Sequence, residues 1–178
     1  MLCKDFSRFL FLGVLCMSSC YANCTKSFGS LHCGADTEEN ISFSGNVTLD
    51  GTTVTNNLDV NGQLHAISAN ISKANISGNS DFSQAVISKK CNITGYLKAD
   101  KSNFIADIVA NTNKLELNKT KTNNIVVKSN NGEKAIVMLN NSTVQGDISF
   151  SSGNGEVINN NSTIKGRVSG GVVTKKGV

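Results

Sequence analysis

Large apolar residues recur every eleven positions, and this spacing limits the fold of the chain more than any other sequence feature. They are Leu49, Val60, Ile71, Phe82, Ile93, Phe104, Leu115, Val126, Val137 and Ile148. The residue two positions earlier is mostly small, as at Ala69 and Ser80, and the residue between the two is polar in most repeats, as at Asn70 and Asp81. Alternation of inward and outward side chains is typical of a short β-strand.

Strands this short cannot bury an apolar face alone, so the repeats must stack and complete one another's core. Eleven residues are too few to circle such a core, whereas twice that number is enough. We therefore predict an all-β, single-domain parallel β-helix, wound right-handed, with two repeats in each coil of about 22 residues. The ten apolar residues would form a core ladder in which Phe82 lies directly over Phe104.

An eleven-residue period also occurs in right-handed coiled coils, which are the helical alternative to a β-helix. Asn, Gly, Ser, Thr and β-branched residues dominate this chain and strong helix formers are scarce, which favours strands. Gly51, Gly62 and Gly95 share one position of the repeat. That position suits a corner with a positive φ angle, where glycine carries no steric penalty.

The two ends of the repeat region differ from its centre. Residues 141–148 are echoed by residues 161–168, which indicates a coil that has lost about two residues at a corner. Residues 23–45 lack the period, and we expect them to form an N-terminal cap over the open sheet edge. We place the β-helix at residues 46–170 and a C-terminal strand or tail at 171–178, where an open edge would permit end-to-end self-association.

Residues 1–22 have the organisation of a secretory signal peptide. A short basic start precedes an apolar run over residues 9–17, and small residues follow it. This order predicts cleavage after Ala22. The alternative is a lipoprotein box ending at Cys20, which would be acylated and would anchor the protein to the outer membrane.

The remaining cysteines fit the oxidising compartment that export implies. Cys24 and Cys33 lie close together, and we predict a disulfide between them that closes a small N-terminal loop. Zinc binding by these two residues with His32 is the alternative, although the spacing matches no standard zinc site. Cys91 takes a position that other repeats give to Ala or Ser, so we expect a buried thiol that behaves as a small hydrophobe.

Candidate groups for metal binding or catalysis are few. In the predicted two-repeat coil Asp59 and Asp81 would stack, as would Asn70 and Asn92, and facing carboxylates can attract Ca²⁺. The nonapeptide signature of calcium β-rolls is absent. His65 beside either aspartate would make an acid–base pair, but a solvated surface histidine is the simpler interpretation. We predict no catalytic residue, no cofactor and no metal.

The repeat resembles two known groups of solenoids. Residues 69–73 and 74–78 resemble two tandem pentapeptide repeats, whose units have the order small residue, Asn or Asp, Leu or Phe, Ser or Thr, any residue. This order by itself produces Asn-x-Ser/Thr triplets, such as the one at Asn75, so the triplets do not indicate glycosylation. Residues 60–66 and 146–155 resemble small secreted bacterial β-helix proteins and bactofilin-type solenoids. The resemblance covers residues 44–172 and implies a β-helix fold.

These observations lead to a prediction of function by class. The net charge of +4 is dispersed, which gives no indication of nucleic-acid binding. The sequence has no second long apolar stretch, so we predict no transmembrane segment in the mature chain. We predict a secreted, periplasmic or envelope protein of a bacterium, structural and non-catalytic, whose polar faces contact a glycan or protein partner. The alternatives are a small carbohydrate-active β-helix enzyme and an acylated envelope lipoprotein.

Overall fold

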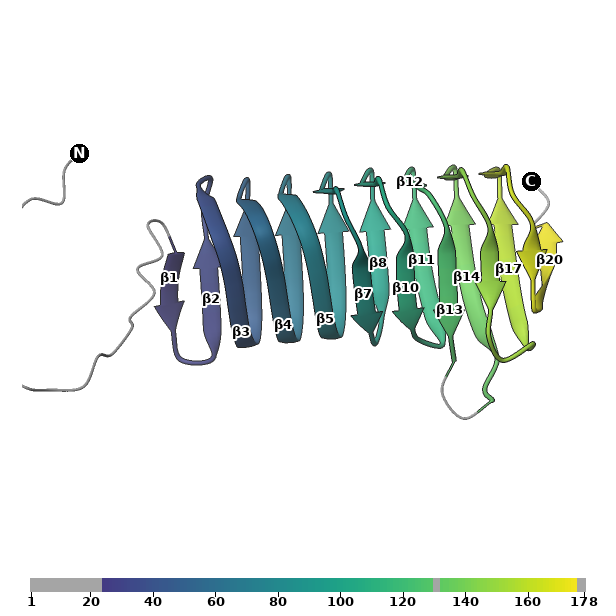
Figure 1. Ribbon diagram of the computed structural model, residues 1–178, viewed down its shortest axis with the longest axis horizontal. Helices are drawn as coiled ribbons and strands as arrows, with labels where there is room; N and C mark the ends of the chain where they lie inside the picture. The colour runs from purple at the N-terminus through teal and green to yellow at the C-terminus, as the bar shows by residue number, and fades with distance from the viewer. Residues whose placement is uncertain (1–23, 130–131, 176–178) are drawn as a thin grey trace, which may run out of the picture.

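The computed structural model describes residues 24–129 and 132–175, which form an elongated rod of strands stacked along one axis (Figure 1). Within these ranges there are 20 strands and no helix. The strands are β1 (Cys24–Ser27), β2 (Ser30–Cys33), β3 (Thr37–Asp50), β4 (Thr53–Ile67), β5 (Asn70–Ser83), β6 (Val86–Ile87), β7 (Cys91–Thr94), β8 (Leu97–Asp100), β9 (Asn103–Phe104), β10 (Ile108–Asn111), β11 (Lys114–Asn118), β12 (Lys121–Thr122), β13 (Ile125–Lys128), β14 (Ala135–Asn140), β15 (Thr143–Val144), β16 (Ile148–Phe150), β17 (Gly155–Asn160), β18 (Thr163–Ile164), β19 (Val168–Ser169) and β20 (Gly171–Lys175).

Each coil passes through three faces, which we name by their strands. The A face contains β7, β10, β13, β16 and β19, the B face contains β8, β11, β14, β17 and β20, and the C face contains β6, β9, β12, β15 and β18. The long strands β3, β4 and β5 each contribute to all three faces. Successive coils pair in parallel, so the predicted parallel β-solenoid is confirmed.

The predicted coil of two eleven-residue repeats is too long for most of the rod. Val60 pairs with Ile76 and Ile76 with Ile93, so the chain returns to the same column after sixteen and then seventeen positions. Only towards the C-terminus does a coil reach the predicted length, between Leu115 and its partner Val137. Eleven residues span two of the three faces, so three repeats complete two coils, and Val60 and Ile93 share a column two coils apart.

Nine of the ten residues of the predicted core ladder are buried, and the exception follows from the coil length. Val126 is half-buried on the outer side of the A face, between the inward-facing Ile125 and Val127. Its column contains Val109 and Ser149, which also point outward. As the coils lengthen towards the C-terminus, a count in elevens loses register and reaches an outward position.

A column of glycines makes the corner between the A and B faces. Gly45, Gly62, Gly78 and Gly95 stack there, with φ angles between 125° and 148°. A Cβ on Gly78 would lie 1.8 Å from the carbonyl oxygen of Gly62, so no side chain fits. The prediction that Gly51 shares this column is wrong, because Gly51 lies at the corner between the B and C faces.

The B–C corner is built from residues with left-handed backbone and from small inward side chains that follow them. Lys101 and Lys119 have φ angles of 48° and 47° at equivalent positions. The next residues, Ser102 and Thr120, are buried, and the Ser102 N–H donates to the Thr120 hydroxyl at 3.3 Å. The Thr120 N–H donates to Ser142 at 3.1 Å, so hydroxyl groups satisfy the buried amides of successive coils.

The N-terminal cap is shorter than the predicted residues 23–45. It is an antiparallel hairpin of β1 and β2, joined by the predicted Cys24–Cys33 disulfide. β2 pairs with β3, whose stacking on β4 already begins at Thr37. The different composition of the first coil hides its repeat, because its inward positions include Glu38 and the half-buried Phe43.

Candidate functional site

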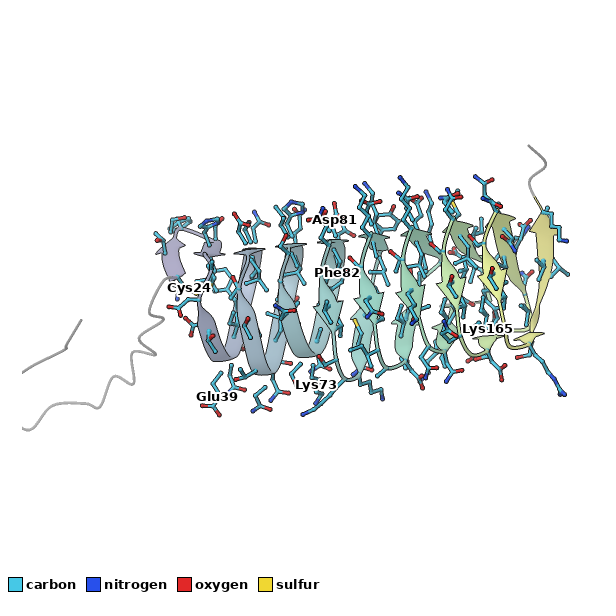
Figure 2. All side chains as sticks on the ribbon, turned by 90° about the horizontal axis from the view of Figure 1, so that it is seen from above. Cys24, Glu39, Lys73, Asp81, Phe82 and Lys165 are labelled. Atoms are coloured by element: carbon cyan, nitrogen blue, oxygen red, sulfur yellow. A yellow bond between two sulfur atoms is a disulfide. The ribbon has the colours of Figure 1, made fainter. Side chains whose placement is uncertain are left out.

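Two shallow grooves run along the rod, one on each side of the glycine corner. On each face two columns of outward side chains flank a column of inward side chains, and the inward column forms the floor of a groove. We call them the A groove and the B groove, after the faces on which they lie. Figure 2 shows the alternation that creates them, with Asp81 projecting from the rod while the adjacent Phe82 points into it.

The A groove has a volume of about 320 Å³ and crosses β3, β4, β5 and β7. Asp59, Asn75 and Asn92 stack along one wall. The Asn75 side-chain amide donates to the Asp59 carboxylate at 2.7 Å, and the Asn92 amide donates to the Asn75 carbonyl oxygen at 2.8 Å. These bonds hold the amides in one orientation and leave a second N–H on each amide for other partners.

The second wall and the floor of the A groove complement this row. Exposed Ser44, Asn61, Ser77 and Thr94 form the opposite wall, one from each coil. The floor is the outer side of the strands at Phe43, Val60 and Ile76. Val60 and Ile76 belong to the core and are each only 3% exposed, so the half-buried Phe43 is the main apolar side chain of the floor.

The charges around the A groove are few. Among the described residues that line it, Asp59 alone is ionisable. Lys26 lies over the Phe43 ring at 5.6 Å, at the N-terminal end, and Lys73 and Lys90 occupy the neighbouring outward column. The groove itself therefore offers amide, hydroxyl and apolar surface with a single carboxylate.

The B groove has a volume of about 460 Å³ and a different chemistry. One wall carries Asn46, Gln63, Asn79 and Tyr96, and the other carries Thr48, His65, Asp81 and Lys98. The His65 Nδ1 atom lies 3.8 Å from the Asp81 carboxylate, and both side chains are well exposed, at 49% and 40%. A contact this exposed contributes little to stability.

The B groove ends at a cluster around Tyr96. Burial, together with hydrogen bonding to Glu116 and the charges of Glu116 and Asp81, raises the pKa of Tyr96 to about 12. The Lys114 ammonium lies 2.6 Å from Glu116, and this hydrogen bond is the main reason why the pKa of Glu116 is lowered. Tyr96 therefore presents a neutral hydroxyl at every physiological pH.

Several predicted neighbours lie apart because the coil is shorter than expected. Asp59 and Asp81 do not stack: Asp59 is on the A face against Asn75, and Asp81 is on the B face between His65 and Lys98. Asn92 stacks on Asn75 instead of Asn70. Of the two aspartates proposed as partners of His65, the structure brings Asp81 to it.

The other predicted sites are readily placed. Cys91 is buried and free, and Cys20 lies outside the described residues, as does the signal peptide. Residues 24–129 and 132–175 contain no group of three His, Cys, Asp or Glu side chains suited to a metal ion. No helix in these ranges is long and apolar enough to cross a membrane.

The Asp59–Asn75–Asn92 row is the feature that the sequence analysis missed. In the sequence these polar residues are 16 and 17 positions apart, and a search at multiples of eleven does not detect that spacing. Comparison with known proteins adds no assignment: no protein-family model matches the chain, and no curated protein or solved structure matches it significantly.

Proposed function

We propose that this chain is an exported, non-catalytic binding and structural protein whose rigid solenoid holds an extended polymer partner in the A groove. The observation that supports this most directly is the hydrogen-bonded row of Asp59, Asn75 and Asn92. Groups fixed by such bonds lose little rotamer entropy on binding, which favours affinity for a partner. Repetition of the same groups from coil to coil suits a partner that is itself repetitive.

Location outside the cytosol is part of the proposal. The Cys24–Cys33 disulfide supports an oxidising compartment, because disulfides in small domains persist mainly in exported proteins. The leader-like residues 1–22 and the resemblance to secreted bacterial β-helix proteins support the same location. Intact mass of the mature protein distinguishes cleavage after Ala22 from acylation of Cys20, since a lipid adds mass that cleavage alone does not.

A carbohydrate-active enzyme is the second candidate, and the His65–Asp81 pair in the B groove favours it. A histidine beside a carboxylate can act as a general base or acid. The test is turnover of a panel of polysaccharides by the wild-type protein and by His65→Ala and Asp81→Ala. We expect no turnover; cleavage that both substitutions abolish would establish the enzyme and overturn the non-catalytic proposal.

The binding proposal is tested by mapping contacts on the isotope-labelled protein. Glycan and protein fractions of a bacterial envelope are added separately, and amide chemical shifts are recorded. We expect shifts at Asp59, Asn75 and Asn92 with one fraction and none on the C face. Unchanged A-groove signals with both fractions would contradict the proposed function.

A further inference from the structure

We propose that the A groove binds a linear, uncharged β-linked glycan that lies along the rod axis with one sugar residue over each coil. This inference rests on the proposed function and adds the chemical class of the partner. It follows from three properties of the groove: its repeat distance, the groups on its walls and floor, and its charge.

The repeat distance favours a glycan over a peptide. Neighbouring strands of a sheet lie about 4.8 Å apart, so each wall offers equivalent groups at this interval along the rod. An extended peptide advances about 3.3 Å per residue and falls out of step with the coils after one residue. One pyranose ring in an extended β-linked chain is close to the strand spacing in length, so one ring can lie over each coil. In a β-1,4-linked chain successive rings are turned by about half a turn, so the same hydroxyl groups face the two walls alternately.

The walls supply partners for sugar hydroxyls on both sides of such a chain. The fixed amides of Asn75 and Asn92 present an N–H donor and a carbonyl acceptor, which together satisfy two adjacent hydroxyl groups. Ser77 and Thr94 face them across the groove, and a hydroxyl side chain both donates and accepts. A polymer of neutral hydroxyl-bearing units can therefore be hydrogen-bonded at every coil.

The floor is suited to the carbon-bound face of a sugar ring. The half-buried Phe43 ring lies at its N-terminal end, and at its centre the inward-pointing Val60 and Ile76 leave the strands free of outward side chains. Pyranose rings in β-linked chains carry their C–H bonds on the ring faces, and these bonds are apolar. A ring placed face down over Phe43 removes apolar surface from water, and every ring that lies on the floor has its hydroxyls directed towards both walls.

The charge of the groove argues against a charged polymer. Asp59 is the one ionisable group among the described lining residues, so the walls hold no row of charges that could pair with successive units of a charged chain. Lys73 and Lys90 lie in the neighbouring column, outside the walls, where they compensate the charge of Asp59. An uncharged glycan needs no such row of charges.

The test is calorimetric titration of the full chain with β-1,4-linked glucose oligosaccharides of increasing length. Four coils line the groove, so we expect affinity to rise up to about four sugar residues and then to level off. Asn75→Val should lower the affinity for the longest oligosaccharide by about 3–10-fold, since one hydrogen bond contributes roughly that factor. Asn103→Val is the matched control on the C face, also a half-buried outward asparagine on a strand, and should leave affinity unchanged.

The outcomes separate this inference from the proposed function. Polygalacturonate, a poly-lysine chain and an uncharged peptide are titrated in parallel. If one of these binds in place of the neutral glycan, and Asn75→Val weakens it, the glycan inference is overturned while the proposed function stands. If no polymer binds, or if Asn103→Val has the same effect as Asn75→Val, both are overturned.

Discussion

The rings of Phe82 and Phe104 meet edge to face inside the rod, with their centroids 5.6 Å apart. The two residues do not stack, because Phe82 lies on the B face and Phe104 on the C face of the next coil. In its own column Phe82 has Ala66 before it and Ala99 after it, so small residues make room for its ring. The aromatic pair therefore joins two faces and two coils across the core.

We predict that Phe82→Ala lowers the free energy of unfolding by about 3–5 kcal/mol, because it leaves a cavity in a fully buried site. Part of this loss is shared with Phe104. A double-mutant cycle with Phe82→Leu and Phe104→Leu, followed by chemical denaturation, should give a coupling energy of about 0.5–1.5 kcal/mol. Strictly additive effects would contradict a direct contact between the rings.

Phe82 and Phe104 also show which parts of the fold the eleven-residue period predicts and which it does not. A count in elevens finds nine of its ten inward positions correctly, because eleven residues cover two of the three faces in the shorter coils of the N-terminal half. It therefore predicts strands, core and solenoid, yet it assigns the wrong neighbours. The number of residues between coils is fixed by the geometry of the corners, such as the stacked Gly62 and Gly78. Periodicity alone does not show whether an eleven-residue repeat spans two of three faces or half of a coil.

The candidate site could not be predicted from the sequence for the same reason. A groove forms between columns, so it exists only when the correct residues are stacked on one another. With the correct step, Asp59 meets Asn75 and the row of hydrogen bonds appears. Local features required no such knowledge: the Cys24–Cys33 disulfide and the offset of 20 between the residues 141–148 and their echo were both predicted correctly.

The glycine corner makes a prediction about backbone. In Gly78→Ala the added methyl group would overlap the Gly62 carbonyl, and the φ angle of 137° is strained for alanine. We expect a loss of at least about 2 kcal/mol in the free energy of unfolding. Gly34→Ala is the control, because no atom beyond its two chain neighbours lies within 4 Å of its added Cβ, and thermal melts should show little change. Equal melting temperatures for the two variants would refute the close packing of the corner.

The disulfide makes a prediction about the N-terminal end. Its cysteines are nine positions apart, and opening a loop of this size costs about 2–3 kcal/mol in the chain-entropy model. In Cys24→Ala/Cys33→Ala we expect faster hydrogen exchange in β1, β2 and the B-face part of β3, because each coil is stabilised mainly by its neighbours. Exchange in β14 and β17 should stay unchanged. Loosening spread evenly along the rod would be inconsistent with this local role.

The buried thiol of Cys91 makes a prediction about alkaline stability. Burial raises its pKa from 9.0 to about 12, so above pH 9 the thiol ionises in the unfolded chain while the folded chain keeps its proton. The unfolded state then binds fewer protons, and stability falls by up to about 1.4 kcal/mol per pH unit until the folded thiol ionises near pH 12.

Removing the thiol isolates this effect. Cys91→Ala should flatten the decline between pH 9 and 11, measured by urea denaturation at fixed ionic strength. Tyr96 loses its proton in the unfolded chain from about pH 10 and adds a decline common to both proteins, so the difference between the two curves reports Cys91 alone. If the two curves stay parallel from pH 8 to 11, the thiol is not held neutral in the core as the structure places it.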